Sequence, residues 1–306
     1  MRALVLVPLS CTIAGLVLSF LCIFAGSKPG FMDDYNLVTL NTSTLGHNLI
    51  PNTKTPAVIN NLFPFIPQNI NGATNQLNDI IGDVVDELAH DLGINQWYGW
   101  HAMNFCEGNY KPSPKARPVM YQVVECSNPT AGFHFNIADV LDQQLGMGPL
   151  RISLKDLHWP NEIQKVIDQL STALQAAVAL YSISIAATGI LIFTSLITLF
   201  VNSATLLIMV NLLLAGVSLL ALFIASIIIS VINSRTMKVV QEKGNMIGVY
   251  AYKGQKYLAL TWCSMAVMLL AFLSWTVIFI LGRKDKNSTK SEKTSLGSKF
   301  RLGRWP

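Results

Sequence analysis

Charged residues are scarce in this chain of 306 residues. Asp, Glu, Lys and Arg together make up 13% of it, whereas a soluble protein usually contains about 25%. Apolar residues make up 51%. A soluble domain of this length could not bury so much apolar surface, so the composition excludes an ordinary soluble protein and predicts one that lies partly in lipid.

Motifs for catalysis and for cofactor binding are also missing. The sequence has no Gly-rich phosphate loop, no His-Glu-x-x-His, no Gly-x-Ser-x-Gly and no paired cysteines at metal-ligand spacing. We therefore expect no enzymatic activity, no cofactor and no metal site. Neither nucleic acid nor a small-molecule substrate is expected as a partner.

Three long runs contain no charged residue at all: 3–25, 174–232 and 258–282. About 20 apolar residues cross the roughly 30 Å of hydrocarbon in a bilayer, because a helix rises about 1.5 Å per residue. The first and third runs therefore cross once, and the middle run crosses twice, turning near the polar residues 198–205. The sequence predicts four membrane spans, at 1–25, 174–201, 204–232 and 258–282.

The first run has a second interpretation as a secretory signal, since Arg2 precedes it and Ala25 is a small residue at its end. Its apolar stretch is longer than the core of a typical signal, which favours an uncleaved span.

The three uncharged runs that form the predicted spans contain no Asp, Glu, Lys, Arg or His. Channels, transporters and intramembrane enzymes usually need such groups, so a channel or transporter subunit is a less favoured function. Asn211 is the most polar residue at depth, and we expect it to form a hydrogen bond between helices.

Basic residues predict the orientation in the membrane. The segment 283–306 contains eight basic residues against two acidic ones, and positive flanks stay in the cytoplasm. This basic tail and the N-terminus are then cytoplasmic, 26–173 is an extracellular domain, and 233–257 is a second extracellular loop. One observation opposes this orientation, because the second loop is itself basic, with Arg235, Lys238, Lys243, Lys253 and Lys256.

Two cysteines support the assignment of 26–173 to the outside. Cys106 and Cys126 are expected to form a disulfide, which persists in oxidising compartments and has no evident purpose in the cytosol. Asn41 begins an Asn-x-Ser sequon and is a predicted glycosylation site. All five histidines also lie in this segment: His47, His90, His101, His134 and His158.

Local patterns predict an α+β domain. Apolar spacing indicates an amphipathic helix over 76–92 and a short helix over 136–145. The β-branched and aromatic residues of 117–127 indicate a strand that ends at Cys126. A last helix is expected to begin near Pro160 and to continue into the second span.

An aromatic cluster precedes the first cysteine and comprises Trp97, Tyr98, Trp100 and His101. We interpret it mainly as core of a small domain that has few other large side chains, with contact to a partner as the alternative. A lone histidine beside a cysteine is expected to be a hydrogen-bonded framework residue rather than a metal ligand.

These residues carry a resemblance to the fungal claudin-like Sur/PalI family, which includes the cortical-patch and eisosome Sur proteins and the pH-response regulator PalI. The matching motif consists of Trp97, Tyr98, Trp100, His101, Asn104, Cys106, Glu107 and Gly108. Cys126 follows the motif, and Gly26 and Pro29-Gly30 follow the first span. The claudin signature itself differs, because Gly99-Trp100 lacks an intervening Leu.

The resemblance implies a fold class and a function. The expected fold is mainly α: a claudin-like bundle of four transmembrane helices with a disulfide-linked α+β extracellular domain between spans one and two. The implied function is to organise an eisosome-type domain of the plasma membrane, with lateral protein partners or further copies of the chain. The alternative is a PalI-like sensor or accessory subunit in ambient-pH signalling. The five histidines would suit this role, because the ordinary pKa of histidine lies near 6.5.

The tail suggests a further partner. Its basic residues would lie beside the inner leaflet, where each contributes about 1 kcal/mol of attraction to anionic lipid. The residues predicted to make this contact are Arg283, Lys284, Lys286, Lys299, Arg301 and Arg304. The alternative is a basic flank whose end binds nothing.

Overall fold

The computed structural model describes residues 2–44, 95–111, 120–130, 161–201, 205–245 and 248–301. The helices expected over 76–92 and 136–145 lie outside the described residues, as do the first three residues of the strand expected over 117–127.

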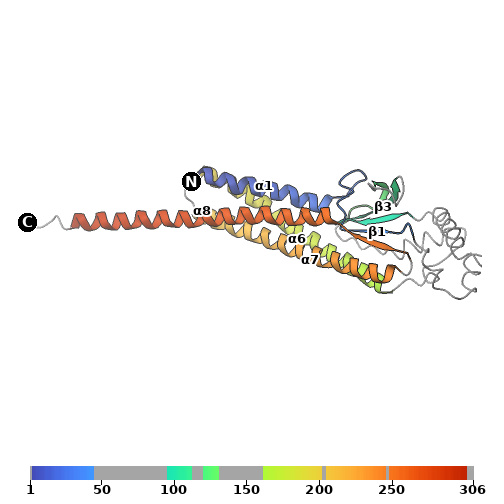
Figure 1. Cartoon of the computed structure of the whole chain (residues 1–306). Coiled ribbons are helices and arrows are strands. Elements are labelled where there is room, and N and C mark those ends of the chain that lie inside the picture. The colour runs from blue at the N-terminus through green and yellow to red at the C-terminus, as the bar shows by residue number, and fades with distance from the viewer. Residues whose placement is uncertain are drawn as a thin grey trace, which may run out of the picture. The chain divides into compact units, whose positions relative to one another are not determined.

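Four long helices dominate the described chain: α1 Arg2–Phe24, α6 Asn161–Phe200, α7 Thr205–Gly244 and α8 Gln255–Arg301. Each contains a stretch that is long and apolar enough to cross a membrane, which confirms the expected number of spans. The expected helix after Pro160 is also present, because α6 runs without interruption from Asn161 through the second predicted span to Phe200. Figure 1 shows these helices in the colours of their sequence order.

The helices α6 and α7 are longer than a bilayer requires. Each has 40 residues, which correspond to about 60 Å, twice the thickness of the hydrocarbon layer. Each therefore continues beyond the membrane. The segment 233–257, which was expected to be a loop, contains the last part of α7, a strand and the first residues of α8.

A small antiparallel sheet accompanies the helices. Its strands are β1 Val38–Asn41, β2 Trp97–Trp100, β3 Phe105–Lys111, β4 Met120–Cys126 and β5 Tyr250–Lys253. The strand order is β4-β3-β2-β1-β5. β4 confirms the strand expected to end at Cys126. β5 was not expected, and it adds the segment between α7 and α8 to the sheet by pairing with β1, with Leu40 opposite Ala251.

The chain divides into two compact units. The membrane unit comprises Met1–Leu21, Leu180–Ser226 and Leu260–Pro306. The sheet unit comprises Cys22–Ala179 and Ile227–Ala259. All four long helices contribute to both, so each unit is described below by itself.

Hydrogen bonds between polar side chains join neighbouring helices of the membrane unit. The amide of Asn211 on α7 bonds to two threonines of α6: its nitrogen donates to Thr198 Oγ1 over 3.0 Å, and its oxygen accepts from Thr194 Oγ1. This geometry confirms the interhelical bond expected for Asn211. Ser218 lies 2.7 Å from Ser184 Oγ and 2.8 Å from Thr188 Oγ1.

Hydrogen bonds between hydroxyl groups also join α8 to α7 and to α1. Thr261 Oγ1 on α8 donates to Ser226 Oγ on α7 over 2.8 Å, and Ser19 on α1 lies 3.3 Å from Ser264 on α8. Gly15 permits the close approach of these last two helices, since a Cβ at that position would lie 2.5 Å from Met268 Sδ. The four helices therefore form one bundle in which α8 contacts both α1 and α7.

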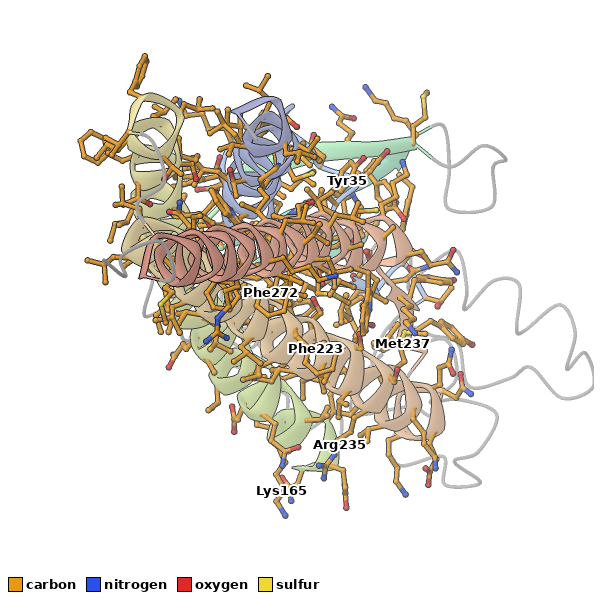
Figure 2. The ribbon with its side chains drawn as sticks, turned by 90° about the vertical axis from the view of Figure 1, so that its left-hand side faces the viewer. Tyr35, Lys165, Phe223, Arg235, Met237 and Phe272 are labelled. Carbon is orange, nitrogen blue, oxygen red and sulfur yellow. A yellow bond between two sulfur atoms is a disulfide. The ribbon has the colours of Figure 1, made fainter. Side chains whose placement is uncertain are left out.

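The core of the sheet unit lies between the sheet and the helix ends. Every residue of β1 and β2 is buried. The first turns of α6 supply buried Ile163, Val166 and Ile167, while Asn233 Nδ2 on α7 donates to Leu37 O over 2.8 Å. On the outer side of the same two helices, Lys165 and Arg235 are exposed (Figure 2).

Candidate functional site

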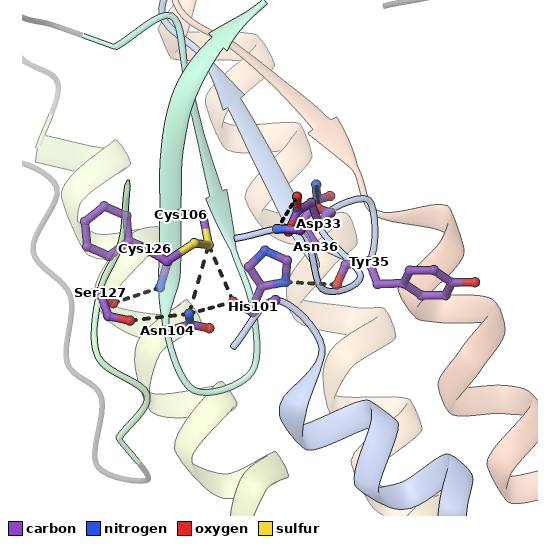
Figure 3. The surroundings of a disulfide bond; sticks show 11 residues. Asp33, Tyr35, Asn36, His101, Asn104, Cys106, Cys126 and Ser127 are labelled. Atoms are coloured by element: carbon purple, nitrogen blue, oxygen red, sulfur yellow. Dashed lines mark hydrogen bonds between the residues drawn. A yellow bond between two sulfur atoms is a disulfide. The ribbon is translucent and has the colours of Figure 1, made fainter. Parts of the chain in front are cut away.

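The two predicted cysteines form a disulfide between neighbouring strands. Cys106 of β3 pairs directly with Cys126 of β4, and their Cα atoms are 4.0 Å apart. Cys106 is completely buried, and its sulfur lies 3.5 Å from the carbonyl oxygen of Gly26. The bond therefore joins β3 to β4 at a buried position beside the segment that follows α1 (Figure 3).

Asn104 strengthens the same connection. Its side-chain Nδ2 donates to Gly26 O over 2.8 Å and to Ser127 O over 3.4 Å. Its backbone carbonyl oxygen accepts from the His101 backbone nitrogen over 2.9 Å. The buried side-chain amide thus joins the segment that follows α1 to the residue after β4, while the backbone carbonyl closes the turn between β2 and β3. The side chain has a structural role as a hydrogen-bond donor to two backbone carbonyls.

His101 is buried beside these groups. Its Nδ1 lies 3.1 Å from the carbonyl oxygen of Tyr35, so Nδ1 carries the proton and donates it (Figure 3). Burial lowers the pKa of His101 to about 4, and the bond to Tyr35 only partly opposes this shift. Nε2 is buried and has no hydrogen-bond partner within the described part of the chain. His101 is therefore a neutral framework residue, as expected from the sequence.

Gly26 makes room for the histidine ring. Its φ is +72°, and a Cβ on Gly26 would lie 2.2 Å from His101 Nδ1. Gly30 has a similar φ of +84°, but a Cβ there would meet nothing within 4 Å. The two glycines share a backbone conformation that disfavours other residues and differ in what surrounds them.

This pair gives a matched test of the contact between Gly26 and His101. We expect Gly30→Ala to destabilise the sheet unit by about 1 kcal/mol through backbone strain alone. Gly26→Ala causes the same backbone strain and also displaces the buried ring of His101. We therefore expect it to destabilise the sheet unit by more than about 2 kcal/mol in total. Thermal unfolding of the purified protein in nanodiscs measures the difference, and equal melting temperatures for the two variants would contradict it.

The predicted aromatic cluster lies inside the sheet unit. Trp97, Tyr98 and Trp100 are at most 2% exposed. Trp97 Nε1 donates to Asn109 O over 3.3 Å, and its ring meets that of Tyr121 edge-on at 5.1 Å. The burial of these three side chains supports the core interpretation over contact with a partner.

The last two motif residues also have structural positions. A Cβ on Gly108 would lie 2.0 Å from Gln122 O, so only glycine allows β3 and β4 to pair closely there. Glu107 is half-buried and lies opposite Glu125 of β4. The spacing of the motif thus reflects the packing of β2, β3 and β4 around the disulfide.

Asn41, the predicted glycosylation site, is the last residue of β1 and is 9% exposed. Its Oδ1 accepts a hydrogen bond from the Ser43 backbone nitrogen over 2.9 Å. Because a glycan needs an accessible amide nitrogen, this enclosed position does not favour modification of the folded unit. Glycosylation of Asn41 stays a prediction.

The residues predicted to contact anionic lipid lie at the end of the chain. Arg283 and Lys284 are exposed at the end of the fourth span, and the Arg283 guanidinium lies 5.2 Å from the centre of the Phe279 ring. Lys286, Lys299 and Arg301 belong to the continuation of α8. Arg304 lies outside the described residues. Contact with lipid stays a prediction.

Two contacts of the sheet unit were not foreseen. β5 pairs with β1, and Lys256 Nζ lies 2.6 Å from Asp34 Oδ2, an exposed ion pair between the start of α8 and the segment after α1. The alternation of Tyr250 and Tyr252 with smaller residues was the available signal for a strand. Among the described residues, no group of three His, Cys, Asp or Glu side chains is placed to hold a metal ion.

Comparison with known proteins gives one match. The model of the SUR7/PalI family matches residues 4–274, which include all four candidate spans in whole or in large part and all five strands. No curated protein and no solved structure matches the chain.

Proposed function

Because the chain belongs to the SUR7/PalI family, we propose that this multi-pass membrane protein is a non-enzymatic organiser of a lateral domain in the plasma membrane, of the eisosome or cortical-patch type. In this proposal the sheet unit is extracellular and both termini are cytoplasmic. The disulfide supports that orientation, since such a bond persists outside the cytosol.

The polar side chains of the membrane unit carry the argument against a transport function. Asn211 is completely buried, and both ends of its amide bond to threonines of the neighbouring helix. Ser184, Thr188 and Ser218 likewise bond to one another. A transport path needs polar groups that face a passing ion or solute, whereas these groups hold helices together. A bundle fixed in this way suits a scaffold that associates laterally with proteins and lipids.

Imaging of living cells tests the organiser role. A fluorescent fusion of the full chain is expected to form stable patches at the plasma membrane, with little recovery after photobleaching over minutes. A freely diffusing four-span protein expressed at the same level is the control. A diffuse surface signal or an endosomal one would contradict the organiser and favour the sensor.

One of the five histidines, His101, is not available as a pH sensor. His101 has a pKa of about 4 because it is buried, so it stays neutral through the range in which ambient pH is sensed. The remaining histidines, His47, His90, His134 and His158, lie outside the described residues. A histidine-based sensor would therefore have to rely on these four residues.

A further inference from the structure

Two strands form the open edges of the sheet. The order β4-β3-β2-β1-β5 places β4 at one edge and β5 at the other. Within the described residues β4 pairs only with β3, and β5 pairs only with β1. The outer backbone groups of an edge strand have no partner in their own sheet, so they can pair with a strand of another molecule. Both edges belong to the sheet unit.

The β4 edge exposes apolar side chains. It is seven residues long and contains neither Lys nor Pro, the residues that usually protect an edge strand. Met120 is 59% exposed and Val124 is 56% exposed. The register with β3 shifts beside Val124, which leaves Val124 without an opposite residue in β3. An edge of this length and composition favours the addition of a further strand.

The two edges carry opposite charges. Glu125 is the charged residue of β4 and Lys253 is the charged residue of β5, and both side chains are exposed. Among the described residues, neither of them forms an ion pair. The pairings that connect β5 to β4 across the sheet place both side chains on the same face. An edge of one copy therefore complements the opposite edge of another copy in charge.

The surroundings of Glu125 favour a cation at this edge. Glu125 lies directly opposite Glu107 of β3, and like charges in opposed positions of a sheet repel one another. A lysine on an edge strand usually keeps sheets apart. Here Lys253 of a second copy would instead reduce the repulsion between the two glutamates.

We propose that copies of this chain associate head to tail, with β5 of one copy beside β4 of the next. Neighbouring strands of the sheet are all antiparallel, so β4 and β5 run in the same direction and would pair as parallel strands. With Lys253 of one copy opposite Glu125 of the next, Tyr252 comes to lie beside Val124. Tyr252 is 51% exposed, so the contact covers two exposed apolar side chains and forms one ion pair.

The proposal rests on the organiser function and gives it a means of lateral association. A contact between two different edges leaves one edge free on each outer copy, so it can repeat from copy to copy. Pairing of two identical edges would stop at a dimer.

Exchange of the two charges tests the contact. Full-length chains that carry a donor or an acceptor dye are reconstituted in phosphatidylcholine liposomes, and energy transfer is measured as the protein-to-lipid ratio rises. Glu125→Lys alone and Lys253→Glu alone each place like charges opposite one another. Each is expected to raise the ratio for half-maximal transfer about tenfold. Both substitutions in one chain restore opposite charges, and we expect the transfer of the unaltered chain.

Lys238→Glu is the matched control, because Lys238 is exposed on α7 of the same unit and lies on neither edge strand. It changes the net charge as Lys253→Glu does and should leave the transfer unchanged. The substituted side chains are exposed, so we expect equal melting temperatures. Equal transfer by all variants, or a double variant no better than the single ones, would overturn the proposal.

Cross-linking separates the head-to-tail contact from the pairing of two identical edges. The free cysteines Cys11, Cys22 and Cys263 are first replaced by alanine. In this chain, Glu125→Cys together with Lys253→Cys is expected to give a ladder of oligomers with a short bismaleimide, whereas either substitution alone should leave monomers. A dimer from Glu125→Cys alone would show that β4 pairs with β4, and the proposal would be wrong.

Imaging of the Glu125→Lys fusion in living cells keeps this proposal apart from the organiser function. A diffuse signal that returns to patches in the double variant would support both. Stable patches of Glu125→Lys, despite weaker transfer in liposomes, would leave the organiser function in place and show that the edge contact is not its means. Association of the unaltered chain in liposomes, with a diffuse signal in cells, would leave only the edge contact.

Discussion

Replacing Cys106 and Cys126 by alanine is expected to lower the free energy of unfolding of the sheet unit by about 3 kcal/mol. The bond closes a loop with a sequence separation of 20 residues, and a closed loop of that length restricts the unfolded chain by about this amount. Hydrogen exchange in nanodiscs measures the effect, because protection of the β3 and β4 amides should fall roughly a hundredfold.

A free cysteine supplies the control for this prediction. Cys263 is exposed and belongs to α8 of the membrane unit, so Cys263→Ala should leave the exchange of β3 and β4 unchanged. Treatment of the unaltered chain with a reductant should reproduce the effect of the double replacement. Protection that survives reduction would show that packing around Trp97 alone holds the strands together.

Acid is expected to destabilise the sheet unit through His101. The pKa of this histidine is about 4 in the folded protein against 6.5 when it is unfolded, because burial disfavours the charged ring. The unfolded state therefore binds more protons between these values, so stability falls as the pH drops from about 6.5 towards 4. The expected loss from this group is about 3 kcal/mol, complete below pH 4 and absent above about 7.

His101→Asn isolates this contribution from all other titrating groups. Asparagine retains a donor for the carbonyl oxygen of Tyr35 and has no proton to gain. The melting temperature of the unaltered chain should fall more steeply than that of the variant between pH 6.5 and 4. Parallel curves for the two proteins would show that His101 titrates normally, and would return it to the residues available for pH sensing.

The sequence predicted the membrane architecture because each span is specified locally. An uncharged run of sufficient length must become a helix in lipid, where no water can satisfy its backbone. The charge-free runs 3–25, 174–232 and 258–282 therefore indicated four spans without any knowledge of contacts. The strand before Cys126 and the disulfide were also predictable, because strand composition and paired cysteines are local signals.

The sheet partners were decided by tertiary structure. β5 has only four residues and comes from a segment more than 200 residues after β1, and a short strand gains its stability only from the neighbour with which it pairs. The roles of Gly26 and Asn104 also depend on a contact with residues far along the chain, so the motif predicted their importance to the fold but not their partners.

The basic tail shows the same division. Its charge, and hence its preference for an anionic partner, follows from composition alone. The continuation of α8 to Arg301 after the apolar residues end was not predictable, because the Ser, Thr and Gly content of the tail gave no local signal for a helix. The sequence by itself determined the four spans, the disulfide and the sign of the tail. Tertiary structure decided which strands meet and what buries His101, because both depend on residues that are brought together only by folding.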